Sequence, residues 1–222
     1  MCGRFSLRVE MEELLSYYGL IQSNYTYTPR YNIAPGQSIT ALIDSNSGCK
    51  MGPLRWGLVP SWATDERMGY KMINARAETL AEKPAFRQSY SRRRCIIPAD
   101  GYYDWKKDTK QPHRITMNDE SIFSLAALYD NWVAPDGNKL HSCTIITTES
   151  NDILSTIHDR MPVILPKEHH DTWLDRSITD ITVLQQLLIP FPSKPMTAYQ
   201  VSPMVGNVKN DVPACIEPFI EQ

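Results

Sequence analysis

Most of the strand-like segments in this chain are short and are joined by turns rather than by helices. They are rich in β-branched or aromatic residues and span residues 39–43, 54–59, 95–98, 102–106, 113–117, 122–128, 140–148, 162–165 and 198–201. Turn pairs such as Asp136-Gly137 and Asn118-Asp119 separate some of them. This order predicts an α+β fold dominated by an antiparallel sheet that is curled or barrel-like, rather than a doubly wound sheet.

Helix signals are fewer than strand signals. Residues 10–18 carry apolar side chains at helical spacing and are followed by Gly19, a common stop signal. Residues 166–174 begin with proline, and residues 181–188 end just before Pro190. With 42% hydrophobic residues in 222, the chain has enough apolar surface for one sizeable core. We therefore expect a single domain over residues 1–222 with a few peripheral helices.

Several classes of protein are excluded by what the chain lacks. It has no run of about 18 apolar residues, and its first residues do not resemble a secretory signal. We expect a cytoplasmic monomer that makes no contact with a membrane. The five cysteines include no CxxC pair and no Cys/His cluster with zinc spacing. The sequence therefore predicts reduced thiols, no metal and no cofactor.

The net charge of −2 conceals a basic middle of the chain. Residues 50–114 hold 14 Lys or Arg against 7 Asp or Glu, so the remainder is strongly acidic. Such an excess is what a binding site for an anionic polymer would show. It is equally compatible with an ordinary mixed surface, and the sequence leaves the two open.

Cys2 is the candidate for the chemically active residue. Cysteine is small enough to permit removal of Met1, which would leave an α-amine and a thiol on one residue. The amine condenses with an aldehyde to an imine, and the thiol then closes a five-membered thiazolidine. Both groups keep a nucleophilic fraction near neutral pH at their ordinary pKa values. By itself, a cysteine at position 2 is more simply an incidental residue on a frayed terminus.

An ordered set of short motifs surrounds this cysteine along the chain. The motifs are CGRF at 2–5, RYNIAPG at 30–36, WGLVP at 56–60, INARAET at 73–79, RRCIIP at 93–98, ADGYYDWK at 99–106, IHDRMP at 157–162 and VGNVKN at 205–210. Each is weak alone, but in this order they resemble the SRAP family, the SOS response-associated peptidases. The resemblance extends over nearly the whole chain and implies the SRAP fold.

The resemblance implies an activity on damaged DNA. Family members bind single-stranded DNA, including its junctions with duplex, and trap abasic sites as covalent DNA–protein crosslinks. The cysteine after the initiator Met forms the thiazolidine with the ring-opened sugar, and Cys2 stands at that place. Protection of the lesion in the DNA damage response, and location at the nucleoid while bound, follow from the same likeness. A lyase side reaction is expected from the imine stage.

Three further residues match positions of the family's site. Asn74 corresponds to an asparagine that holds the abasic sugar, and an amide both donates and accepts hydrogen bonds. His158 corresponds to a histidine that moves protons near neutral pH. Asp104 stands where the family usually has glutamate, so the carboxylate is one methylene shorter. We therefore expect a slower crosslink, or a slower reversal, than a glutamate would give.

The same motifs supply the predicted DNA contacts. Arg4, Arg76 and Arg160 are expected to bind phosphate or sugar, because a guanidinium suits phosphate bidentately. Lys209 is a weaker candidate, and Pro35 with Gly36 is expected to form a fixed wall of the cleft. Trp62 either stacks on a base or belongs to the core. The other four tryptophans are expected in the core: Trp56, Trp105, Trp132 and Trp173.

Three alternatives stay open at this level. An N-terminal cysteine also begins glutamine amidotransferases, although none of the later motifs fits them. Cys2 and His158 could instead form a thiol peptidase limited to removal of residue 1. A non-covalent module for single-stranded DNA would need only the basic middle and Trp62. A covalent protein–DNA band that survives denaturation would distinguish the trapping reaction from non-covalent binding of DNA.

Overall fold

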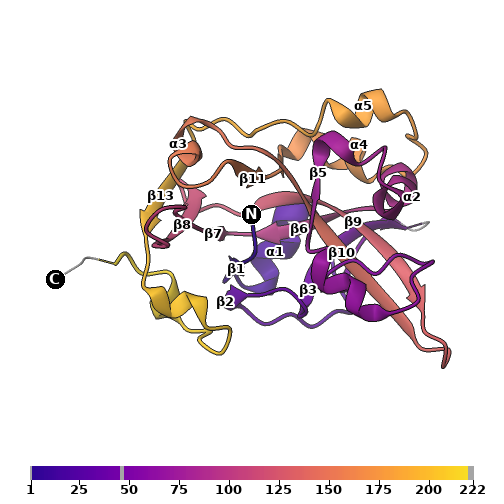
Figure 1. Cartoon of the computed structure of the whole chain (residues 1–222), viewed down its shortest axis with the longest axis horizontal. Helices are drawn as coiled ribbons and strands as arrows, with labels where there is room; N and C mark the ends of the chain where they lie inside the picture. The colour runs from indigo at the N-terminus through magenta and orange to yellow at the C-terminus, as the bar shows by residue number, and fades with distance from the viewer. Residues whose placement is uncertain (1, 46–47, 220–222) are drawn as a thin grey trace.

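The computed structural model describes residues 2–45 and 48–219, and Figure 1 shows its arrangement. Its strands are β1 (Phe5–Leu7), β2 (Arg30–Ile33), β3 (Ser38–Ser45), β4 (Gly48–Trp56), β5 (Asn74–Arg76), β6 (Arg94–Ala99), β7 (Gly101–Trp105), β8 (Pro112–Met117), β9 (Phe123–Val133), β10 (Lys139–Glu149), β11 (Arg160–Pro162), β12 (Ile164–Leu165) and β13 (Met196–Gln200). Its α-helices are α1 (Met11–Tyr18), α2 (Pro84–Arg92), α3 (Asp152–Ser155), α4 (His170–Leu174) and α5 (Ile181–Gln185). Short 3-10 turns include η1 (Glu66–Lys71), η2 (Ala77–Thr79), η3 (Lys167–His169), η4 (Pro203–Gly206) and η5 (Pro213–Cys215).

A closed barrel forms the centre of the molecule. Strand β3 pairs with β4 and β6, β6 pairs with β9, β9 pairs with β10, and β10 returns to β4. All of these pairings are antiparallel except β10 with β4. Strands β5, β11 and β12 add to the rim by pairing with β10 or β9. The predicted barrel-like, antiparallel-dominated α+β fold is therefore confirmed.

A second sheet, ordered β13-β8-β7-β1-β2, lies beside the barrel. It is antiparallel throughout, and β1 is one of its inner strands, with Phe5 opposite both Ile33 and Tyr102. Phe5 also packs against Trp56, with ring centroids 5.3 Å apart. The start of the chain is thus fixed between the second sheet and the barrel, which places Cys2.

Strand β6 buries both of its faces, and its alternate side chains enter different cores. On β6, Cys95 and Ile97 belong to the core shared with β1 and β7, whereas Ile96 belongs to the core under the helices. Every residue of β6 is buried, so the strand appears in the sequence as a continuous apolar run rather than as an alternation. Helices α4 and α5 cover the second of these cores, which includes Trp173 and Leu184.

Arg94 fastens helix α2 to the barrel. Its buried guanidinium donates to the carbonyls of Tyr90 at 3.0 Å, Ser91 at 2.7 Å and Trp173 at 2.6 Å. The last carbonyls of a helix have no partner within the helix, so one arginine satisfies the ends of both α2 and α4. This contact matters for the site because α2 carries exposed cations.

The structure corrects several expected boundaries. The strand expected at 54–59 ends at Trp56, because Gly57 has a φ of +127° and leaves the extended region. The strand expected at 162–165 divides into β11 and β12, and the helix expected at 166–174 is the 3-10 turn η3 followed by α4. Strands β1, β2 and β5 and helix α2 were not expected from the sequence.

Candidate functional site

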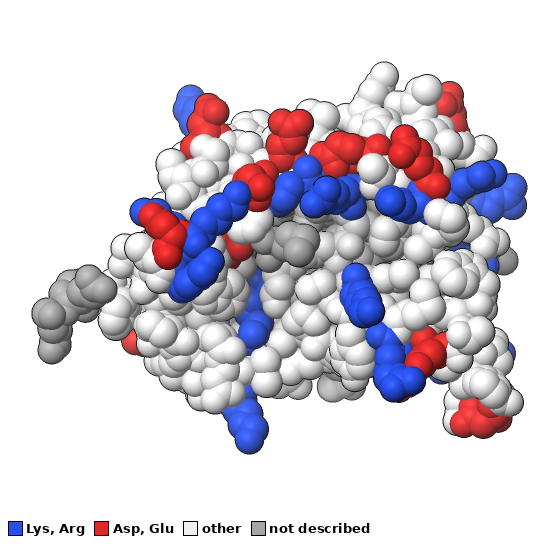
Figure 2. Space-filling view, viewed as in Figure 1, with Lys and Arg blue, Asp and Glu red and all other residues white. Residues whose placement is uncertain are grey.

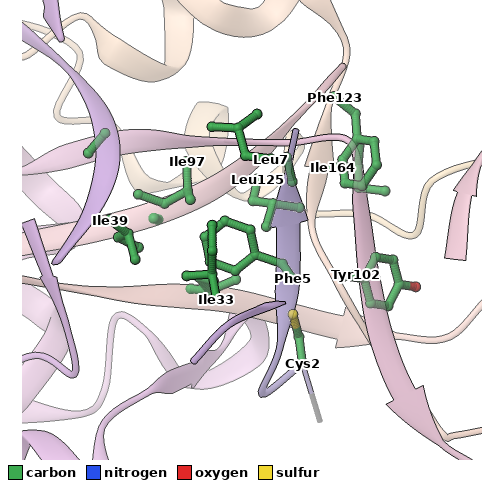
Figure 3. Packing of buried hydrophobic residues seen from close by; sticks show 14 of the residues in the cluster. Cys2, Phe5, Leu7, Ile33, Ile39, Ile97, Tyr102, Phe123, Leu125 and Ile164 are labelled. Carbon is green, nitrogen blue, oxygen red and sulfur yellow. The ribbon is translucent and has the colours of Figure 1, made fainter. Parts of the chain in front are cut away.

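Cys2 lies immediately before β1 and is fully buried. Its side chain is directed into the cluster that contains Phe5 and Ile33, beside Tyr102 (Figure 3). The carbonyl of Arg4 accepts a hydrogen bond from the amide of Tyr103 at 2.9 Å, which holds this segment against β7. Burial, and then the Asp104 carboxylate, raise the pKa of the Cys2 thiol to about 12. The thiol is therefore protonated at neutral pH.

Asp104 lies near the end of β7 and is buried. The amide of Trp105 donates to its Oδ1 at 3.0 Å. Burial raises the pKa of Asp104 above its ordinary value, and His158 acts in the opposite direction. The Asp104 carboxylate also acts on the Cys2 thiol, whose pKa it helps to raise. A carboxyl with a raised pKa is a suitable proton acceptor near neutral pH.

Burial lowers the pKa of His158, and the Asp104 carboxylate acts in the opposite direction. The amide of Arg160 donates to His158 Nδ1 at 3.0 Å, while the Asp159 carboxylate lies 2.8 Å from the same nitrogen. The contact with the amide has hydrogen-bond geometry, so we assign Nδ1 as the acceptor and Nε2 as the protonated nitrogen of the neutral ring. Asp159 is exposed and pairs instead with Lys107 at 3.0 Å. His158 is thereby arranged as a hydrogen-bond donor through Nε2.

Asn74 begins β5, which pairs in parallel with β10. Its Nδ2 donates to the carbonyl of Ile73 at 3.1 Å, and its buried Oδ1 has no hydrogen-bond partner among residues 2–45 and 48–219. Asn74 also borders a hollow of about 590 Å³ that includes Trp62 and Arg76. An acceptor without a partner beside an open hollow is suited to a ligand hydroxyl.

The three predicted arginine contacts differ in their surroundings. The guanidinium of Arg4 donates to Asn32 Oδ1 at 3.1 Å and to the carbonyls of Val205 and Gly206. Arg160 is held by Glu78. Arg76 is exposed and makes no ion pair within the described part of the chain. Two of the three guanidinium groups are thus already bound by the protein.

Trp62 is 55% exposed, so the interpretation of it as a core residue is wrong. The other tryptophans lie as expected, with Trp56, Trp132 and Trp173 buried and Trp105 partly buried. Trp62 separates the hollow beside Asn74 from a second hollow of about 680 Å³.

Tyr70 is a functional candidate that the sequence interpretation missed. It is 63% exposed, and the guanidinium of Arg55 lies 5.3 Å from its ring centroid. A side-chain atom added at Gly36 would lie 3.8 Å from its ring, so the predicted wall of Pro35 and Gly36 adjoins it. Its only sequence signal is an aromatic residue between Gly69 and Lys71, which is too common to single out.

Positive side chains continue past the site. The two hollows beside Trp62 are lined by Lys71, Arg76, Lys83, Arg87 and Arg92. Figure 2 shows Lys and Arg side chains in a band across this face of the molecule, with acidic side chains along its upper border. Lys209, on the segment after η4, is also exposed. Five cations of the basic middle of the sequence therefore lie around Trp62, whereas Arg94 and Arg114 of the same stretch are buried.

Neither a metal-binding cluster nor a membrane-spanning helix is present in the part of the chain that the structure describes. No group of three or more His, Cys, Asp or Glu side chains there is arranged to hold a metal ion. No helix there is long and apolar enough to cross a membrane. All five cysteines are free. Met1, whose removal the sequence interpretation requires, lies outside the described residues.

Comparison with known proteins gives one consistent result. Residues 1–208 match the family model described as SOS response associated peptidase (SRAP). The chain is 49% identical to "Abasic site processing protein YoqW" of Bacillus subtilis, over 98% of this chain and 99% of the relative. It is 31% identical to "Abasic site processing protein HMCES" of Xenopus tropicalis, over 87% and 67%. A crystal structure of a protein from Bacteroides thetaiotaomicron superposes with a TM-score of 0.89 at 29% identity, covering 99% of this chain and all of that one.

Proposed function

Because the chain belongs to the SRAP family, we propose that it processes abasic sites in DNA by trapping them covalently on Cys2. The names of its relatives support an abasic site as the substrate, and one observation supports the proposed chemistry at Cys2. Cys2, Asp104 and His158 lie far apart in the sequence, yet the Asp104 carboxylate shifts the pKa of both the Cys2 thiol and the His158 ring. The protein acts in this proposal as a monomer on single-stranded DNA, without a metal or cofactor.

The amine of Cys2 begins the reaction. Removal of Met1 supplies the α-amine, which attacks the aldehyde of the ring-opened sugar and releases water as the imine forms. The thiol then adds to the imine carbon, and its proton passes to the imine nitrogen. The product is a thiazolidine. A thiol with a pKa of about 12 is a poor leading nucleophile, so the order amine first and thiol second fits the buried site.

Asp104 carries the proton transfers, and His158 supports them by hydrogen bonding. The Asp104 carboxylate, made more basic by burial, accepts the proton of the attacking amine and returns it to the hydroxyl that leaves as water. The Nε2–H of the neutral His158 ring donates a hydrogen bond to the sugar oxygen as the sugar ring opens. Asn74 Oδ1 accepts from a sugar hydroxyl. Each group thus acts in the protonation state that its surroundings favour.

The band of cations supplies the path of the DNA. Phosphates lie along Lys71, Arg76, Lys83, Arg87 and Arg92, and a base stacks on the exposed face of Trp62. Trp62 and Tyr70 also offer flat faces to the last base pair at a junction of single- and double-stranded DNA. Binding is therefore expected to weaken as salt rises.

Intact mass spectrometry with an abasic oligonucleotide tests the proposal. The wild-type protein should lack the mass of Met1 and should gain the mass of the oligonucleotide minus one water. Cys2→Ser keeps the amine and should give only an imine, which borohydride reduction captures and which otherwise hydrolyses. A wild-type protein that retains Met1 and still forms the adduct in full yield would contradict the mechanism.

The same imine leads to strand cleavage by β-elimination. Cys2→Ser should therefore keep or increase lyase activity while it loses the stable crosslink, because its imine cannot close to a thiazolidine. The wild-type protein should cleave the strand slowly, since closure of the thiazolidine ring consumes the imine. Denaturing gels of an end-labelled abasic strand measure both products in one lane.

A peptidase is the second candidate, because the family description names one. Cleavage of a peptide in trans requires an activated thiolate, whereas the Cys2 thiol is protonated near neutral pH. A fluorogenic peptide library incubated with the processed protein discriminates: turnover that depends on Cys2 and His158 would favour the peptidase. A module that only binds DNA would show neither turnover nor a covalent band.

A further inference from the structure

Trp62 lies in a tight turn that a backbone hydrogen bond closes. The amide of Ala63 donates to the carbonyl of Pro60 at 2.9 Å, so Trp62 occupies the third position of a four-residue turn. Just before the turn, the amide of Leu58 donates to the carbonyl of Met72 at 3.1 Å. The indole of Trp62 is exposed, whereas Ala63 beside it is buried. The turn therefore presents an aromatic ring to solvent on a backbone that has little freedom.

The long hairpin of β9 and β10 directs three polar side chains toward this turn (Figure 1). Asp130 on β9 lies directly opposite Ser142 on β10. Trp132 follows two residues after Asp130, and side chains two residues apart on a strand share a face. Residues opposite each other on paired strands also share a face. Asp130, Trp132 and Ser142 therefore lie on one face of the hairpin.

Each of these three side chains bonds one backbone group of the segment around Trp62. The bonds run from the amide of Val59 to Ser142 Oγ at 2.8 Å, from the amide of Ser61 to Asp130 Oδ2 at 2.9 Å, and from Trp132 Nε1 to the carbonyl of Ala63 at 2.6 Å. All three hairpin residues are buried, so a broken bond would leave a buried polar group without a partner. The hairpin thus fixes the backbone on both sides of Trp62.

Asp130 also binds the end of helix α2. Its Oδ1 accepts a hydrogen bond from the guanidinium of Arg93, the residue directly after the helix. Arg92, the last residue of the helix, lines the hollow of about 680 Å³ together with Trp62. One buried carboxylate therefore connects the two walls of this hollow, the turn of Trp62 and the end of α2.

We propose that Asp130 and Ser142 are positioning residues that hold Trp62 as a fixed stacking surface before DNA binds. This inference rests on the proposed function, in which a base stacks on Trp62. A surface that is already oriented does not have to be ordered during binding, and such ordering costs affinity. The binding of DNA consequently depends on the β9–β10 hairpin, whereas the chemistry at Cys2 does not.

Ser142→Ala tests this without a change in charge. It removes the acceptor of the Val59 amide, so hydrogen exchange in residues 58–63 should accelerate. The Kd for undamaged single-stranded DNA should rise about two- to tenfold, the loss expected when one side chain must be ordered on binding. The abasic oligonucleotide concentration that gives half-maximal trapping should rise equally. The trapping rate at saturation should stay at the wild-type value, because the variant does not alter the surroundings of Cys2.

Two variants of Asp130 isolate its bond to the turn. Asp130→Ala and Asp130→Asn remove the same charge, but the amide oxygen of asparagine can still accept from the Ser61 amide. Asp130→Asn should therefore bind undamaged single strands about two- to tenfold more tightly than Asp130→Ala. Equal affinities of the two variants would show that Asp130 acts through its charge rather than through the turn, which contradicts the inference.

Ser89→Ala is the matched control for Ser142→Ala, because it removes the same atom from another buried serine. The hydroxyl of Ser89 has no hydrogen-bond partner among residues 2–45 and 48–219. Hydrogen exchange in residues 58–63, the Kd for single-stranded DNA and the concentration for half-maximal trapping should all equal those of the wild type. Thermal unfolding of each variant shows whether weaker binding comes from a general loss of fold.

Trp62→Ala shows whether the hairpin acts through the indole. Alone, it should weaken the binding of an undamaged strand about 5- to 150-fold, the range for one stacked base. Adding Ser142→Ala to Trp62→Ala should weaken binding no further, since no stacking surface is left to hold. An additive loss in the double variant overturns the inference, as does wild-type affinity in Ser142→Ala. A wild-type protein that binds single strands but forms no Cys2-dependent adduct refutes the trapping function instead, and the binding measurements then decide this inference alone.

Discussion

Burial of the Asp104 carboxyl raises its pKa, and this has opposite consequences for stability and for activity. In the unfolded chain the carboxyl titrates near pH 3.9, and in the folded chain it titrates higher. Its contribution to stability is complete below about pH 4 and is lost as pH rises through the folded pKa. Asp104→Asn should therefore have the higher free energy of unfolding at pH 7, and the difference should vanish below about pH 4. Urea unfolding at both pH values measures it.

The same substitution should damage the reaction. Trapping by the wild type should slow as pH falls through the raised pKa of Asp104, because the carboxylate is the proton acceptor. Asp104→Asn should be slower by about 10²–10⁴ and should lose that limb of the pH profile. Asp104→Glu restores the family's longer side chain and should change the rate of crosslinking or of reversal. If it changes neither, Asp104 does not do the work of that glutamate.

Tyr102 carries a hydroxyl that the fold leaves without a partner. The residue is 1% exposed, packs edge-on against Phe123, and has no hydrogen bond from its hydroxyl within the described chain. Tyr102→Phe should therefore leave the free energy of unfolding unchanged or raise it by about 1 kcal/mol. The control is Tyr103→Phe, which removes a 2.6 Å bond to the carbonyl of Tyr31 and should destabilise by about 1 kcal/mol. Equal losses in the two variants would contradict this.

The candidate site residues were predicted from their motifs, but their partners within the protein could not be. Cys2, Asp104 and His158 were expected at one site, and the Asp104 carboxylate shifts the pKa of both the Cys2 thiol and the His158 ring. Their roles in the reaction stay predictions. Arg4 and Arg160 were expected to contact DNA, and both are held by side chains 28 or more positions away. Such pairing depends on the register of strands that are remote in sequence. No local pattern contains it.

Elements were predicted well where their periodicity was long. Strand β10 and helix α1 were expected within one residue of their observed bounds, whereas the strand expected at 122–128 extends to Val133 as β9. Strands β1 and β5 have three residues each, too few for an alternation to appear. The middle of β4 contains Gly52 and Pro53, which are typical of a turn. Helix α2 had one signal, Pro84 at its first position.

The segment that carries Trp62 and Tyr70 depends on a close contact between two glycines. A Cβ added at Gly69 would lie 2.6 Å from the carbonyl oxygen of Gly57, and one added at Gly57 would lie 2.7 Å from that of Gly69. Gly69→Ala should therefore lower the free energy of unfolding by about 1–3 kcal/mol. It should also weaken the binding of single-stranded DNA, because both exposed aromatic residues are displaced.

Gly52→Ala is the control for that contact, since nothing lies within 4 Å of an added Cβ there. It should leave the DNA affinity unchanged and alter stability little. Thermal unfolding and fluorescence titration with an oligonucleotide measure the two effects. If Gly69→Ala binds DNA as tightly as Gly52→Ala, the contact between Gly57 and Gly69 does not determine the positions of Trp62 and Tyr70.

At the scale of the whole molecule, Asn32 joins the beginning of the chain to its last described segment. Its buried Nδ2 donates to the carbonyls of Val205, Asn207 and Asn210, and its Oδ1 accepts from Arg4. Asp211 completes the connection by accepting from the amides of Tyr31 and Asn32. The motif at 205–210 therefore supports the segment that carries Cys2 through Arg4 and Asn32. From the sequence, only Lys209 of this motif was singled out, as a DNA contact.

Asn32→Ala should release this segment without opening the barrel. The carbonyls at 205, 207 and 210 lose their shared donor, which should cost about 1–3 kcal/mol. Hydrogen exchange should accelerate in residues 205–215, while amides of β6 and β9 stay protected, because the cores of the barrel do not include this segment. Glu217→Gln, on an exposed residue nearby, should leave exchange unchanged. If Asn32→Ala accelerates exchange in β6 and β9 to the same degree, Asn32 stabilises the whole fold, and the last segment is no separate support for Cys2.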